Sequence, residues 1–195
     1  MGFWGTFVIH RGERALGELL PHIAEFGEAE LCAGAAPGGW QVTRVFCSLN
    51  ELTEGFLTGL RDLTAAPVLA ADVLDSDAAF VTALGVHTEP WQTWLNLDAA
   101  MGYLRAPPSP FDENDNYLGD DWVDPEYERE IAALKEQILA ESPGGEVAAA
   151  RAVAWALDGG LTPGPAGEVL AALVTDEGFV EDQFFTFIGR LGLPA

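Results

Sequence analysis

The chain has very little positive charge. Only nine of its 195 residues are lysine or arginine, against 31 aspartates and glutamates, which gives a net charge of −22 and a sequence pI near 4.1. Lys135 is the only lysine, and the arginines are scattered along the chain. Nucleic acids and anionic lipid surfaces are bound through clustered lysine and arginine, so this composition argues against both kinds of partner.

Cysteine and long apolar runs are also scarce. Cys32 and Cys47 are the only cysteines, and their spacing fits neither a zinc site nor a redox motif. No apolar run approaches the roughly 20 residues that span a bilayer. The first residues lack the basic and apolar regions of a signal peptide. We therefore expect a cytoplasmic, reduced protein with no cofactor.

Apolar residues, in contrast, are as frequent as in ordinary globular proteins. They make up 49% of the chain, and a chain of this length buries about 70% of its unfolded surface. Disordered chains typically combine a high net charge with a low apolar fraction, and the apolar fraction of this chain is not low. A folded protein that needs no disulfide or metal for stability is the expectation.

The first half of the chain alternates between strand and helix patterns. β-branched and aromatic residues predict strands at 3–9 and 40–47. Apolar residues at helical spacing predict helices over 13–26 and 52–63. Between these elements, the small residues of 34–39 predict a loop.

A hairpin and a further helix follow. The apolar runs 67–74 and 78–84 are joined by Asp75-Ser76-Asp77, whose short side chains can bond their own backbone in a tight turn. Thr88 and Pro90 are typical of a helix start, and the apolar residues behind them predict a helix that ends near Leu104.

The pattern changes after residue 105. Residues 106–124 are first rich in proline and then acidic, which predicts a linker or loop. Asp124 followed by Pro125 is typical of a helix start, and helices are predicted from there over 125–138, 147–157, 166–174 and 179–191.

Together these patterns predict an α+β fold. We expect a small mixed sheet of about four strands, covered by helices and followed by an all-helical C-terminal region. The expected division is an α+β domain at 1–105, the acidic linker at 106–124 and a helical region at 125–195. Because short helices are marginal alone, the helical region is expected to pack on the first domain.

The sequence contains no complete catalytic or metal-binding motif. Asp112, Asn114 and Asn116 match the first positions of a calcium loop, but Tyr117 and Val123 stand where the template needs glycine and glutamate. Asp75 and Asp77 are expected to form a turn and not to bind metal. His10, His22 and His87 have no acid or nucleophile close in sequence, and there is no nucleophile elbow. The glycines of 34–39 precede a strand, which is the wrong order for a phosphate loop.

The tryptophans divide into two groups. Trp4, Trp94 and Trp155 fall in apolar patterns and are expected in the core. Trp122 lies instead within an acidic run. An aromatic ring surrounded by carboxylates is typical of an anchor for a basic partner, and the alternative is that the ring fastens the linker to the helices. The candidate partner-binding residues are Asp112, Glu113, Asp115, Asp120, Asp121, Trp122 and Asp124.

Two segments carry a resemblance. The opening Met1-Gly2-Phe3-Trp4-Gly5-Thr6-Phe7-Val8 and the stretch 67–81, with Val73-Leu74-Asp75-Ser76-Asp77, resemble uncharacterised actinobacterial proteins of similar size. The resemblance covers the N-terminal half and implies no activity, because none is attached to that group. The preference for arginine over lysine, with much alanine and glycine, fits a bacterium with GC-rich DNA.

These observations favour a non-catalytic interaction protein whose acidic surface engages a basic protein. Acidic bacterial proteins that neutralise toxins, such as immunity proteins and nucleic-acid mimics, are similar in charge and size and use this electrostatic logic. The alternative is a small enzyme with an Asp, Glu and His pocket between the sheet and the helical tail. A regulatory or scaffold domain is a third hypothesis. If the acidity serves only solubility, no partner is needed.

Overall fold

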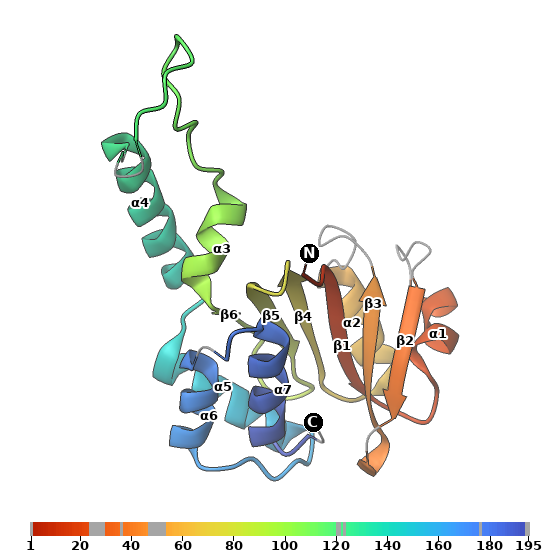
Figure 1. The fold of residues 1–195 in the computed structure, drawn as a ribbon. Coiled ribbons are helices and arrows are strands. Elements are labelled where there is room, and N and C mark those ends of the chain that lie inside the picture. Colours follow the sequence, from red (N-terminus) through yellow and green to blue (C-terminus); the bar gives the residue numbers. More distant parts are fainter. Residues whose placement is uncertain are drawn as a thin grey trace.

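A six-stranded antiparallel sheet forms the centre of the computed structural model (Figure 1). The structure describes residues 2–23, 30–35, 37–46, 54–119, 122, 124–175 and 177–193. In sheet order the strands are β2 (Glu30–Ala35), β3 (Trp40–Phe46), β1 (Gly5–Arg11), β4 (Val68–Leu74), β5 (Ala78–Leu84) and β6 (Trp91–Leu95).

The α+β class is confirmed, whereas the predicted sheet was too small. It has six strands instead of about four, and each described pair is antiparallel, so the sheet is not mixed. The predicted strands at 3–9 and 40–47 correspond to β1 and β3, with Cys47 outside the described residues. The predicted hairpin is β4 and β5.

Two strands were missed for different reasons. β2 falls partly in the predicted loop 34–39, and its sequence Glu-Leu-Cys-Ala-Gly-Ala lacks β-branched residues, so only pairing with β3 reveals it. β6 falls in the predicted helix 88–104, because Trp91, Trp94 and Leu97 recur at helical spacing; in the strand, Trp91 and Trp94 lie on opposite faces of the sheet. Asn96, with φ of 54°, separates β6 from helix α3 (Leu97–Leu104).

The predicted helix over 13–26 is also shorter than expected. It consists of α1 (Leu16–Leu19) and the 3-10 turn η1 (Leu20–His22). Pro21 lies at the start of that turn, where it removes a backbone donor that a longer α-helix would use. A second 3-10 turn, η2 (Pro37–Gly39), precedes β3.

One face of the sheet is covered by α5 (Gly145–Asp158), α6 (Ala166–Val174) and α7 (Val180–Arg190), as Figure 1 shows. Along β1, Phe7 and Ile9 point to this side and join the larger apolar core. Trp155 of α5 is fully buried there, and its indole N–H lies 3.2 Å from the carbonyl oxygens of Val68 and Leu84. Trp155 is thus in the core as predicted.

The opposite face packs against α1 and α2 (Glu54–Thr64), the helix predicted over 52–63. Val8 joins the apolar core on this side. Four buried polar side chains share the face by strand alternation: Thr6, His10, Thr43 and Asp72.

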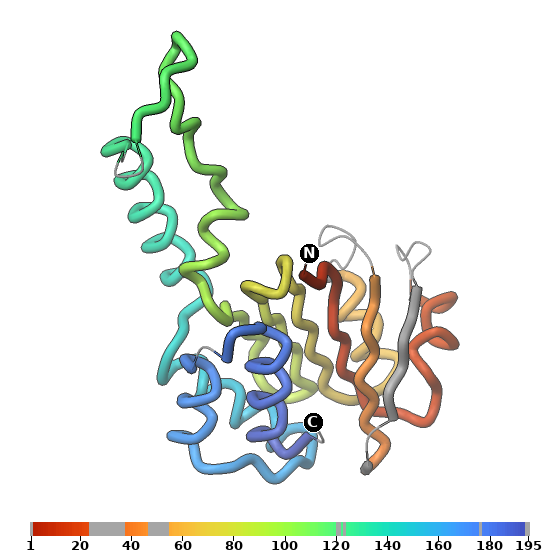
Figure 2. Tube along the Cα trace, in the orientation of Figure 1, coloured from red at the N-terminus to blue at the C-terminus, as the bar shows by residue number. Residues whose placement is uncertain are grey.

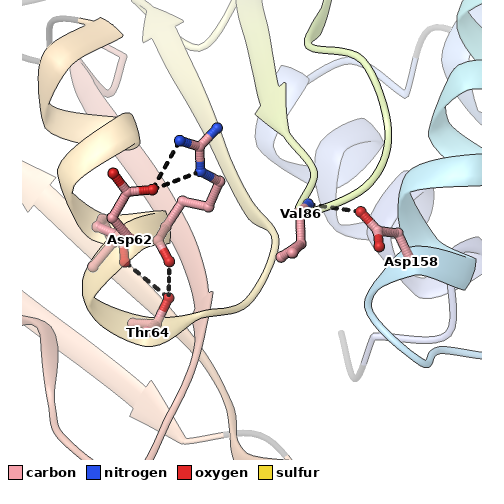
Figure 3. Close-up of polar contacts among 6 residues, drawn as sticks. Asp62, Thr64, Val86 and Asp158 are labelled. Carbon is pink, nitrogen blue, oxygen red and sulfur yellow. Dashed lines mark hydrogen bonds and ion pairs between the residues drawn. The ribbon is translucent and has the colours of Figure 1, made fainter.

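The loop after β5 is fastened to the end of α5. Asp158 accepts hydrogen bonds from the backbone N–H groups of Val86, His87 and Thr88 at 2.7, 2.9 and 3.3 Å, the first of which is drawn in Figure 3. Burial opposes ionisation of the carboxyl, but these bonds outweigh it and hold the pKa of Asp158 below its usual value. Gly85 lies so close that a Cβ there would meet Asp158 at 2.6 Å.

An arm projects from the β6 side of this body (Figures 1 and 2). We use this name for residues 97–141, which comprise α3, the chain from 105 to 124, and α4 (Pro125–Glu141). The predicted cap is confirmed, since the Asp124 carboxylate accepts from Glu126 N and Tyr127 N at 2.8 and 3.3 Å. No residue of α4 is buried. In the described part of the chain, no helix is long and apolar enough to cross a membrane.

Candidate functional site on the arm

A groove of about 320 Å³ lies on the arm, between the extended chain and the start of α4. Its walls combine proline rings, two aromatic side chains and two carboxylates. We call this site the arm groove; it is lined by Pro107, Pro108, Pro110, Trp122, Asp124, Tyr127 and Glu128.

Local sequence explains why the groove stays open. Consecutive prolines keep the chain extended, because each fixes its own φ and restricts the residue before it. Proline at the first position of α4 is tolerated, since that N–H has no helical partner. The two sides are joined by the Tyr127 hydroxyl, which donates to the Arg105 carbonyl at 3.0 Å, and by the Arg105–Glu130 ion pair at 2.7 Å.

The tip of the arm is a small hairpin. Phe111 and Tyr117 form an antiparallel bridge, and their ring centroids lie 5.5 Å apart. The Asp112 carboxylate accepts from the backbone N–H groups of Asn114 and Asn116 at 2.8 and 2.9 Å and from the Asn116 amide. Hydrogen bonds from Asn116 are the main cause that lowers the pKa of Asp112. This carboxylate therefore forms the turn.

The structure separates the sequence-predicted binding residues into two places. Asp112, Glu113 and Asp115 lie on the tip hairpin, whereas Trp122 and Asp124 line the arm groove. The predicted residues Asp120 and Asp121 lie outside the described residues.

Sequence reasoning missed the other groove residues. The prolines were interpreted only as helix breakers, and Tyr127 only as part of an apolar helix stripe. The sequence did contain a signal for such a groove. Three prolines are followed along the chain by a tryptophan and a tyrosine, and flat apolar side chains are frequent in docking grooves. Trp122 is half-buried within this setting, and no hydrogen bond involving its indole is found in the described residues.

The base of the arm is fastened to the body by an aromatic contact. Trp4 is 49% exposed, so its predicted place in the core was wrong. Its ring meets that of Tyr103 edge-on at 5.5 Å, and the Tyr103 hydroxyl donates to Asp77 in the β4–β5 turn. Hydrogen bonding to this carboxylate raises the pKa of Tyr103 to about 12. Asp77 thus serves as a turn residue and an anchor for α3.

Charge is concentrated on the arm. Residues 106–141 contain eleven carboxylates and two cations, a net −9 in 36 residues. The other 159 residues contain 20 carboxylates and seven cations, a net −13. Charge per residue on this segment is therefore about three times that of the rest of the chain. Two nearby cations are engaged already, because Lys135 pairs with Asp98 and Arg129 donates to the Pro125 carbonyl at 3.0 Å.

In the described residues, no hydrogen bond joins a histidine ring to a carboxylate, although the backbone N–H of His87 donates to Asp158. His10 is buried on the α1 and α2 face; burial lowers its pKa, against the opposing contact of its Nε2 with the Arg14 carbonyl at 3.2 Å. Asp72 shares this face but pairs with Thr6, four residues from His10 along β1, or about 13 Å. His22 and His87 are exposed.

The interface between the sheet and α5–α7 is apolar over most of its area. Among the described residues there, the buried polar side chains besides the indoles are Ser76, Thr93 and Gln183. The Ser76 hydroxyl donates to the Glu181 carboxylate of α7 at 2.7 Å, and the Gln183 amide donates to the carbonyls of Ala172 and Leu173. In the same described ranges, no group of three or more His, Cys, Asp or Glu side chains is arranged to hold a metal ion.

Comparison with protein-family models, with curated proteins and with solved structures finds no match. The function therefore has to be inferred from the chemistry of the arm and its groove.

Proposed function

We propose that the protein is a non-catalytic binding protein that engages a basic protein partner through its arm. The observation that carries this proposal is the arm groove, where Trp122 and three prolines form an apolar floor beside Asp124 and Glu128. Interfaces commonly combine a central aromatic anchor with a polar rim.

The shape of the arm supports the same function. It extends from the body (Figure 1), and α4 rests on the shorter α3 without burying any of its own residues. Two helices with so little buried surface are marginal alone. The apolar stripe Tyr127, Ile131, Leu134 and Ile138 is only half-buried on the side of α4 that meets α3, so a partner that covers the edges of this contact would add apolar burial.

Electrostatics favours a basic partner over a second copy of this chain. Two arms that each carry a net −9 repel one another, whereas a cationic surface is attracted. The same field increases the rate of encounter with a basic protein at low ionic strength.

Site-specific photo-crosslinking in the source cell tests the proposal. A photoreactive amino acid replaces Leu118, which is 40% exposed at the tip, or Leu157, which is 60% exposed on the body. We expect the Leu118 position to cross-link one protein of high pI, identified by mass spectrometry, and the Leu157 position not to cross-link it. The purified partner should then bind the unmodified chain, with affinity that falls as salt is added.

Equal cross-linking from both positions, or an acidic partner on the arm, would contradict the proposal. A chain that captures no basic protein through the arm would leave solubility as the role of the acidic surface.

A further inference from the structure

We infer that the arm groove receives an arginine side chain of the partner. This inference rests on the proposed function and adds which chemical group the groove recognises. Three features of the arm favour arginine: the flat side chains that line the groove, the carboxylates among them and the engagement of the neighbouring cations in other contacts.

The walls offer flat apolar surfaces. Trp122 and Tyr127 contribute aromatic rings to the lining, and Pro107, Pro108 and Pro110 contribute rigid rings. A guanidinium is planar and weakly hydrated, so it stacks on such faces, and its methylene stem can lie along proline rings. A lysine ammonium is compact and strongly hydrated and gains less from these walls.

The rim supplies the matching negative charge. One oxygen of Asp124 caps α4, and within the described residues the second oxygen accepts no hydrogen bond. The Glu128 carboxylate has no hydrogen bond or ion pair within the described residues. The positive end of the α4 dipole, about half a charge, is smaller than the combined charge of these two groups.

The chain does not fill the groove with an arginine of its own in the described part of the structure. Arg105 is paired with Glu130, and Arg129 donates to the Pro125 carbonyl. Both arginines are thus engaged outside the lining of the groove, and within the described residues no cation pairs with Asp124 or Glu128.

Peptide binding to the full chain tests the inference. The probes are fluorescein-labelled glycine–serine peptides that carry arginine, lysine or citrulline at the same positions, and the readout is fluorescence anisotropy at low salt. Citrulline keeps the shape of arginine without its charge. We expect the arginine peptide to bind about threefold to tenfold more tightly than the lysine peptide, and the citrulline peptide to bind least.

Matched variants locate the site. Glu128→Gln should weaken arginine-peptide binding about threefold, and Trp122→Ala should weaken it about tenfold. Glu136→Gln removes the same charge from an exposed position on α4 outside the groove and should change the affinity less than twofold. Circular dichroism of each variant checks that the helices are intact, and Glu128→Gln serves as the isosteric test if Trp122→Ala alters them.

The outcomes separate the two proposals. Basic peptides that bind equally well to the Glu128, Glu136 and Trp122 variants would overturn the arginine groove and leave the basic-partner proposal standing. Equal affinity for arginine and lysine peptides would also overturn it. No binding of any basic peptide, together with no arm cross-link to a basic protein, would count against the proposed function itself.

Discussion

Asp72 is a carboxyl group buried in the middle of the sheet. Burial raises its pKa to about 7, while the Thr6 hydroxyl, which donates to it at 2.6 Å, acts in the opposite direction. On the same face, burial lowers the pKa of His10. Both groups therefore favour their neutral forms in the folded chain, and both make stability depend on pH, with opposite signs.

Replacing Asp72 isolates its contribution. In the unfolded chain the carboxyl ionises near pH 3.8, and in the folded chain near pH 7. Between these values the folded state holds a proton that the unfolded state has lost, so the contribution of Asp72 to stability falls as pH rises and levels off above pH 7. The free energy of unfolding of the wild type, minus that of Asp72→Asn, should fall by up to about 1.4 kcal/mol per pH unit in this window.

Urea denaturation at several pH values from about 4 to 8 measures this difference. His10 is present in both proteins, so its titration cancels to first order. A difference that does not change with pH would show that the Asp72 carboxyl titrates alike in the folded and unfolded chain.

Two aspartates at helix ends give a second residue-scale prediction (Figure 3). Asp158 accepts from three backbone N–H groups of another segment. Asp62 is exposed, and its carboxylate bonds only the neighbouring Arg61, at 2.8 Å, among the residues that the structure describes. Asp158→Ala should lower the free energy of unfolding by about 1–3 kcal/mol. Asp62→Ala should change it by less than about 0.5 kcal/mol. Similar losses for both variants in thermal or urea unfolding would contradict the clamp assigned to Asp158.

At the scale of elements, the arm should open before the rest of the protein. The described α4 has no buried residue, whereas α5 and α7 each bury five. Amides that lie under few contacts exchange through local opening. Hydrogen exchange monitored by mass spectrometry should therefore show faster exchange over 125–141 than over 145–158, and limited proteolysis should first cut within 106–124. Equal protection of the two helices would contradict this expectation and would indicate that the arm is fixed to the body.

The elements also show where sequence patterns were sufficient. β4 and β5 were predictable because both runs are apolar and the Asp-Ser-Asp turn joins them. The helices after residue 124 were predictable from Asp124 and from apolar spacing. β2 was not, since small residues give no local signal and its strand forms by pairing with β3. In β6, the three-residue spacing of Trp91 and Trp94 matched a helix, and only the pairing with β5 makes the segment a strand.

At the scale of the whole molecule, the candidate site was also predictable from the sequence only in part. Sequence alone singled out Trp122 and the acidic run, because an aromatic ring among carboxylates is unusual. It did not predict that the prolines and Tyr127 would line one groove together with Trp122, since they belong to segments whose relative placement depends on how α4 rests on α3. The division of the acidic run between tip and groove likewise depends on the Asp112 turn.

A last prediction concerns the roles of charge and of the tryptophan ring in binding. With the cross-linked basic partner in purified form, Asp120, Asp121 and Asp124 changed together to Asn should mainly slow association, because these changes weaken the long-range field of the arm. A smaller effect on dissociation is expected from Asp124, which lines the groove. Trp122→Ala should mainly speed dissociation, because a ring buried at the contact acts after encounter. Surface plasmon resonance over a salt series measures both rates.

Salt gives the internal control for this division. The association rate of the wild type should fall as the Debye length shortens to about 8 Å at physiological ionic strength. The triple Asn variant should show a shallower salt dependence, whereas Trp122→Ala should keep the slope of the wild type. If the tryptophan variant changed the salt slope and the aspartate variant changed only dissociation, the assignment of steering to the carboxylates and of anchoring to Trp122 would be reversed. Rates unaffected by all four substitutions would place the interface elsewhere on the protein.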